Sequence, residues 1–142
     1  MPPSEARSAE EGDVERVASL LHAAAPERGL DAYERAVRAR ISEGEGGTLI
    51  ADTATLSWAL DGGALFLYDI VGEGEALAAL VALADRMASD LLAGVLATTL
   101  YEDDPVVDRL SALGFERDWS EPDATGRRVR TLIGLVRPVM SR

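Results

Sequence analysis

The sequence predicts a single α/β domain built on a mixed, mostly antiparallel central sheet with helices on both faces. Helical and strand-like patterns alternate along the chain, tight turns join the strands of its first half, and a strand–helix–strand unit follows them. The 142 residues have the length of one domain, and 47% of them are apolar, which is enough for a core. We therefore treat residues 1–142 as one domain.

Two helices are expected first. Asp13 is a favourable N-cap residue, and apolar residues recur after it at helical spacing until Pro26, before which the helix must stop. A second helix is expected over Leu30–Ser42, because its apolar residues share one face. The three glycines of Glu43–Gly47 then predict a break.

Three short strands are expected next, at Thr48–Asp52, Leu56–Leu60 and Ala64–Val71. The turn Asp61-Gly62-Gly63 has the composition of a hairpin turn between the last two. Because Ala64–Val71 is almost continuously apolar, we expect it to be covered on both faces.

A βαβ unit follows the hairpin. Apolar residues at i, i+3 and i+4 predict a helix over Glu75–Leu91, and Val95–Tyr101 has the pattern of a buried strand. Strands joined by a crossover helix are parallel, so Val95–Tyr101 should lie parallel to Ala64–Val71. Asp104-Pro105 then opens a short helix that ends at Gly114, and Arg128–Val136 is a long return strand.

The composition excludes several classes of function. Acidic residues outnumber basic ones by 25 to 14, and a net charge of −11 repels nucleic acids and anionic lipids, so neither is an expected partner. No cysteine and a single histidine, His22, leave no expected metal site. Neither a membrane-length apolar run nor a signal-peptide pattern is present, so we expect a cytoplasmic protein.

The order of these elements, with Leu113-Gly114-Phe115 after the short helix, resembles the GCN5-related N-acetyltransferase (GNAT) family over nearly the whole chain. The resemblance implies that the parallel strands splay apart and that acetyl-CoA lies in the gap. It also implies that the end of the first strand and the loop after it hold the pantetheine arm and the diphosphate. The cofactor-binding positions are then Ile70, Val71, Gly72, Gly74, Glu75 and Ala76.

The sequence departs from the family pattern at these positions. Val71 stands where the loop usually has glutamine or arginine, and Glu73 and Glu75 add negative charge beside the expected diphosphate. Leu110 stands where the family often has a tyrosine that acts as the general acid.

Asp69 and Tyr101, near the ends of the two parallel strands, are the candidate catalytic residues for proton transfer. A solvated carboxylate and an aromatic ring packed on the sheet are the alternative interpretations. The expected function is acetyl transfer from acetyl-CoA to an unidentified small-molecule or peptide amine. The alternative is a non-catalytic protein of the same fold that serves for binding or dimerisation.

The apolar return strand also suggests an interface. A long apolar strand left at the edge of a sheet invites pairing, so we expect a homodimer through this strand or through the region of Trp119.

Overall fold

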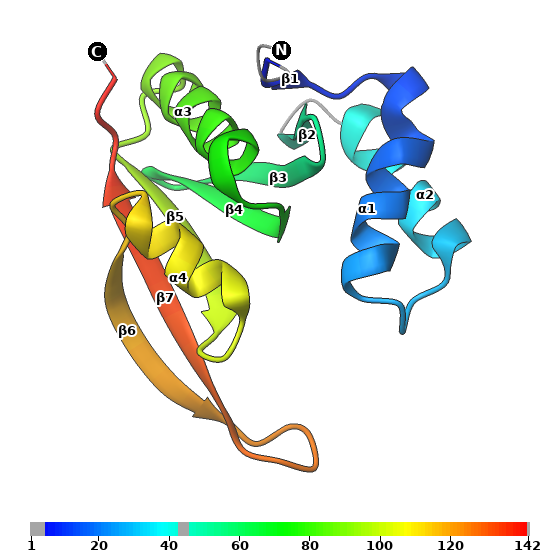
Figure 1. The fold of residues 1–142 in the computed structure, drawn as a ribbon. Helices are drawn as coiled ribbons and strands as arrows, with labels where there is room; N and C mark the ends of the chain where they lie inside the picture. The colour runs from blue at the N-terminus through cyan, green and yellow to red at the C-terminus, as the bar shows by residue number, and fades with distance from the viewer. Residues whose placement is uncertain (1–4, 43–45, 142) are drawn as a thin grey trace.

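The computed structural model describes residues 5–42 and 46–141. Within these residues, seven strands form one sheet in the order β1-β2-β3-β4-β5-β7-β6, in which β4 and β5 are the parallel pair (Figure 1). The strands are β1 (Arg7–Ser8), β2 (Gly46–Ala51), β3 (Ala54–Asp61), β4 (Ala64–Val71), β5 (Val95–Tyr101), β6 (Glu116–Asp123) and β7 (Arg130–Pro138). The helices are α1 (Val14–Ala24), α2 (Leu30–Ser42), α3 (Gly74–Asp90) and α4 (Pro105–Ala112), and a 3-10 turn at Glu11–Asp13 precedes α1.

The core lies on both faces of the sheet, as the sequence predicts. Neighbouring residues of β2 show this, because Leu49 packs in the cluster with α3 and α4 whereas Ile50 packs in the cluster with α1 and α2. Successive side chains of a strand point to opposite faces, so the two helix pairs cover opposite sides. The predicted fold class is therefore confirmed.

The expected break before the first hairpin needs correction. Gly46 and Gly47 belong to β2 rather than to a break, while residues 43–45 of the expected break lie outside the described residues. A Cβ atom at Gly46 would lie 2.7 Å from the carbonyl oxygen of Trp58 on β3, so glycine permits the close approach of these two strands.

The return strand β7 is not at the edge of the sheet. It lies between β5 and β6, so its backbone is paired on both sides and the reason for expecting a dimer through it is removed. The sequence did not predict β6, because nearly all of its side chains are exposed and show no alternation. Trp119 of β6 is 40% exposed, and its indole covers Gly134 of β7.

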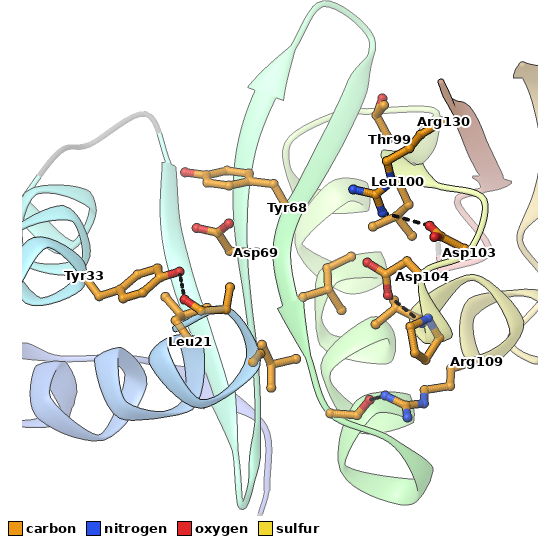
Figure 2. A pocket seen from close by; sticks show the side chains of 17 residues that line it. Leu21, Tyr33, Tyr68, Asp69, Thr99, Leu100, Asp103, Asp104, Arg109 and Arg130 are labelled. Carbon is orange, nitrogen blue, oxygen red and sulfur yellow. Dashed lines mark hydrogen bonds and ion pairs between the residues drawn. The ribbon is translucent and has the colours of Figure 1, made fainter. Parts of the chain in front are cut away.

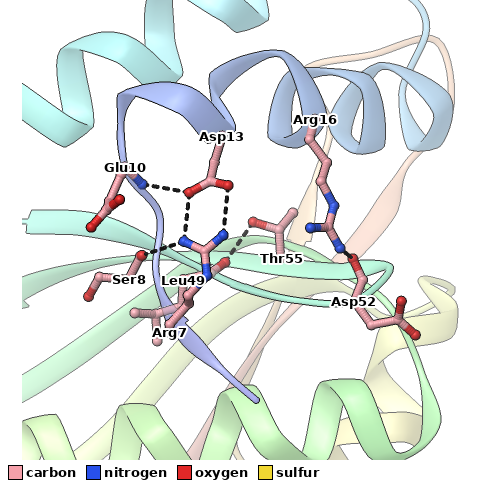
Figure 3. A network of polar contacts seen from close by, with 8 residues as sticks. All are labelled: Arg7, Ser8, Glu10, Asp13, Arg16, Leu49, Asp52 and Thr55. Atoms are coloured by element: carbon pink, nitrogen blue, oxygen red, sulfur yellow. Dashed lines mark hydrogen bonds and ion pairs between the residues drawn. The ribbon is translucent and has the colours of Figure 1, made fainter. Parts of the chain in front are cut away.

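The N-terminal segment is fastened to the domain by a polar network (Figure 3). The Arg7 guanidinium donates two hydrogen bonds to Asp13, of 2.7 and 2.8 Å, and the Glu10 amide donates a third of 2.8 Å. These bonds, with the one from Arg7 the largest cause, lower the pKa of Asp13 to about 2. Arg16 of α1 donates to the Asp52 carbonyl in the β2–β3 turn, which ties the helix to the sheet.

No helix among the described residues is long and apolar enough to cross a membrane.

Candidate functional site

The parallel strands β4 and β5 separate toward their carboxyl ends. Their pairing runs from Ala64–Val95 to Phe66–Ala97 and then stops. At the fork, the Thr98 hydroxyl donates a 2.7 Å hydrogen bond to the Leu67 carbonyl, where a ladder bond would otherwise continue. The strands thus open a gap in the middle of the sheet, as predicted.

An irregularity in β4 accompanies the separation. Thr55 pairs with Val71 and Ser57 with Tyr68, so β4 advances three residues while β3 advances two. The extra residue is the mark of a β-bulge, which bends a strand and re-aims its side chains. Asp69 lies in this bulge with φ +49°, a left-handed conformation that aspartate tolerates better than most residues.

A cleft of about 630 Å³ lies in the gap between β4 and β5 (Figure 2). Residues 68–72 of β4 and the turn after it form one wall, and Thr99 and Leu100 of β5 with the start of α4 form the other. The carboxyl end of α1 and Tyr33 of α2 border it from the opposite face of the sheet. The cleft is therefore reached by elements on both sides of the sheet.

The turn from β4 into α3 depends on two glycines with positive φ. Gly72 has φ +134°, and a Cβ atom there would lie 2.4 Å from the Cβ of Ala54. Gly74, the first residue of α3, has φ +61° and no neighbouring atom within 4 Å of such a Cβ. Glu73 provides no side-chain cap to α3, so the amide groups of the first turn have no capping side chain.

Of the predicted cofactor-binding positions, Ile70, Val71 and Gly72 line the cleft. Gly74, Glu75 and Ala76 form the first turn of α3, directly after it. The structure therefore brings the six positions together along one edge of the gap.

Arg109 of α4 reaches this turn from the other wall. Its Nη1 donates a 3.0 Å hydrogen bond to the Gly72 carbonyl, and its Nη2 lies 3.6 Å from a carboxylate oxygen of Glu73. Arg109 is not among the site residues predicted from the sequence. No local pattern could have indicated it, because the contact joins residues 37 positions apart and exists only once α4 has docked across the gap.

Asp69, one of the two candidate catalytic residues, lines the cleft. Its carboxylate is 2.7 Å from the guanidinium of Arg40, which also donates to the Ser57 hydroxyl at 3.1 Å and lies over the ring of Tyr68 at 4.9 Å. The ion pair with Arg40 anchors the Asp69 side chain at the bulge.

Tyr101, the other candidate, is not among the residues that line the cleft. Its hydroxyl donates a 2.7 Å hydrogen bond to Asp123, which is the main cause of a raised pKa of Tyr101. The guanidinium of Arg130 lies 3.5 Å above its ring and pairs with Asp103 at 2.8 Å, which lowers the pKa of Asp103. The Tyr101 hydroxyl is thus directed to Asp123, which does not line the cleft either, and a catalytic role for Tyr101 stays a prediction that this geometry does not favour.

Leu110, at the position of the usual tyrosine acid, is fully buried in the core and does not line the cleft. Tyr68 and Tyr33 do line it, although neither is a site residue predicted from the sequence. Among the described residues, no group of three or more histidine, aspartate or glutamate side chains is arranged to hold a metal ion.

Comparison with known proteins places the fold. No protein-family model and no curated protein matches the sequence. Among solved structures, a ribosomal-protein-alanine N-acetyltransferase from Brucella melitensis superposes with a TM-score of 0.74 at 16% identity, over 94% of this chain and 98% of that one.

Two further structures agree with this. An acetyltransferase of the GNAT family from Streptococcus pneumoniae has a TM-score of 0.71 at 15% identity, over 95% of this chain and 98% of that one. An aminoglycoside 6'-N-acetyltransferase complexed with coenzyme A has a TM-score of 0.77 at 13% identity, over 96% and 98%. The chain has the GNAT fold, as the resemblance in its sequence implied.

Proposed function

We propose that this protein is an N-acetyltransferase that binds acetyl-CoA in the cleft between β4 and β5. The observation that carries the proposal is the separation of the only parallel strand pair in the described sheet, with a cleft of about 630 Å³ in the gap. A coenzyme A complex among the structures of the same fold supports the choice of ligand.

The residues at the gap fit this ligand. Separated strands expose unpaired backbone groups along the cleft, which can bond to the amides of a pantetheine arm. Gly74 leaves open space at the uncapped amino end of α3, where amide groups and the helix dipole favour a phosphate. Glu73 and Glu75 oppose an anion there, and Arg109 offsets part of their charge.

Bound acetyl-CoA would supply an acetyl group activated as a thioester. The incoming amine nitrogen must lose a proton as its bond to the carbonyl carbon forms and the carbon–sulfur bond breaks. We assign the role of proton acceptor to Asp69, because its carboxylate lines the cleft and is fixed by Arg40.

The leaving sulfur needs less assistance. A thiol ionises near pH 8.5, so a thiolate can leave and take a proton from solvent without a strong general acid. Leu110 provides no proton, and the absence of an acid at that position is therefore compatible with transfer.

An acetyl-transfer assay tests the proposal. The full chain is mixed with acetyl-CoA and one amine at a time, and amine-dependent release of free thiol is measured. The first amines to test are those for which the neighbours are named, an aminoglycoside and a peptide with an N-terminal alanine. We expect thiol release above background hydrolysis with at least one amine class, reduced by Asp69→Asn.

Asparagine also tolerates the left-handed backbone at this position, so the Asp69→Asn substitution removes the base with little strain. If calorimetry detects no binding of acetyl-CoA and no amine releases thiol, the proposal is wrong. The fold then serves as a non-catalytic binding protein.

A further inference from the structure

We infer that Arg109 binds the diphosphate of coenzyme A, and that Glu73 holds the Arg109 side chain in place until the diphosphate displaces it. This inference rests on the proposed function, since it assigns residues to one end of the same cleft. It concerns a contact made from α4, on the wall opposite the loop that follows β4.

Arg109 is positioned to reach a ligand at the start of α3. Arg109 lines the cleft, and its guanidinium bonds to the carbonyl of Gly72, two residues before α3 begins (Figure 2). A group seated on the uncapped amides at the start of α3 would therefore lie close to this guanidinium. The hydrogen bond to the Gly72 carbonyl uses an N–H group of Nη1 and leaves the other N–H donors of the guanidinium for a ligand.

The other arginines near the cleft are held by closer carboxylates. Arg130 is bound to Asp103 at 2.8 Å and stacks on Tyr101, and Arg40, behind the β4 wall, is bound to Asp69 at 2.7 Å. Arg109 has the longest of these ion pairs, at 3.6 Å, with a Glu73 side chain that is 79% exposed. Of these three arginines, Arg109 therefore loses the weakest ion pair when it binds an incoming anion.

The charges around the turn also favour an exchange of partners by Arg109. Glu73 and Glu75 place two negative charges at the amino end of α3, and Val71 contributes no polar side chain to the turn. An exposed ion pair such as that of Arg109 and Glu73 contributes little, since solvent screens it. A guanidinium bonds to phosphate oxygens through paired, charge-assisted N–H groups, so a diphosphate competes with Glu73 for Arg109.

One exchange of partners by Arg109 accounts both for its long ion pair with Glu73 and for the acidic residue in a phosphate-binding turn. Without ligand, the Gly72 carbonyl and the weaker ion pair with Glu73 keep Arg109 over the turn. With ligand, Arg109 turns to the diphosphate and Glu73 is released to solvent. The acidic loop is then a competitor for the cation as well as a source of repulsion.

The test measures the affinity of the full chain, by calorimetry, for coenzyme A and for pantetheine, which lacks the diphosphate. We expect Arg109→Gln to weaken coenzyme A binding by about 10- to 100-fold, the loss of a charged hydrogen bond. Pantetheine binding should be unchanged, and Arg109→Lys should restore part of the affinity for coenzyme A. A purely structural role of Arg109 would weaken both ligands alike and would overturn the inference.

The matched control is Arg117→Gln. Arg117 forms an exposed ion pair with Glu102 at 2.8 Å and is not among the residues that line the cleft. This variant changes the net charge by the same amount and should leave both affinities unchanged. Equal losses in the two arginine variants would mean that only overall charge matters, against the inference.

Glu73→Gln tests the exchange itself. It should tighten coenzyme A binding, and the gain should be larger in the native background than in the Arg109→Gln background. Equal gains would mean that Glu73 acts by repulsion alone, which contradicts the competition.

The outcomes separate this inference from the proposed function. If the native chain binds coenzyme A and Arg109→Gln binds it equally well, the inference fails and the function stands. If the native chain and Glu73→Gln both fail to bind coenzyme A, the proposed function and the inference fail together.

Discussion

Replacing Gly72 by alanine should destabilise the protein far more than the same change at Gly74. Both glycines have positive φ, at +134° and +61°, so a side chain strains the backbone at either position. At Gly72 the new Cβ would also meet the Cβ of Ala54 at 2.4 Å and its Cα at 2.9 Å. At Gly74 nothing lies within 4 Å, so strain is the whole effect there.

The magnitudes follow from these two terms. A strained φ costs about 1–3 kcal/mol, and forcing a methyl group into occupied space costs about 1–3 kcal/mol more. The lower entropy of the unfolded alanine variant returns about 0.4–1 kcal/mol at each position. Taking the middle of each range, we expect Gly72→Ala to lower the free energy of unfolding by about 3 kcal/mol, and Gly74→Ala by about 1 kcal/mol.

Urea unfolding, followed by the fluorescence of Trp58 and Trp119, measures both values. The two variants remove one glycine each from the same turn, so each is the control for the other. Equal destabilisation within about 1 kcal/mol, or a larger effect at Gly74, would refute the packing that places Gly72 against Ala54.

Three further predictions concern side chains outside this turn. Asp85 of α3 is buried and accepts hydrogen bonds of 2.9 and 2.7 Å from the amides of Met140 and Ser141. Asp85→Ala should therefore lower the free energy of unfolding by about 3 kcal/mol and Tm by about 10 °C, whereas Asp90→Ala at the exposed end of α3 should leave both nearly unchanged. The pKa of Asp13 is lowered from 3.8 to about 2, so ionised Asp13 stabilises the fold fully above pH 4, and this stabilisation is lost as the pH falls toward 2. When the free energy of unfolding is measured against pH, the loss in acid should be about 1 kcal/mol smaller for Asp13→Asn than for the native chain, and an equal loss would contradict the network around Arg7. With an amine that is acetylated, Asp69→Asn should lower kcat by about 100-fold and Tyr101→Phe by less than about 3-fold, and the reverse order would return the catalytic role to Tyr101.

The sequence predicts most of the fold because its apolar residues are periodic. The bounds of α2, β4 and β5 agree with their predicted ranges, and α3 differs from its predicted range by one residue at each end. The failures have physical causes: β6 is exposed along most of its length, and the glycines of β2 allow close strand contact rather than a turn. The central position of β7 follows from its pairing with β6, which carries no periodic signal.

The candidate site was predictable in part. Ile70, Val71 and Gly72 could be placed at the gap because the order of the elements resembles that of a known fold. The ion pairs at the site could not be predicted from the sequence, because Arg40 and Arg109 reach their partners from helices that are distant in the chain. Local patterns carry no information about which charged side chains meet across a gap.

Amide hydrogen exchange, measured with and without coenzyme A, tests whether the gap between β4 and β5 is a coenzyme A site. We expect saturating coenzyme A to slow exchange at residues 72–76, where the amides at the start of α3 have no capping side chain, and along the cleft-lining part of β5. If coenzyme A leaves these amides unchanged, or slows exchange only elsewhere in the chain, the gap is not the coenzyme A site.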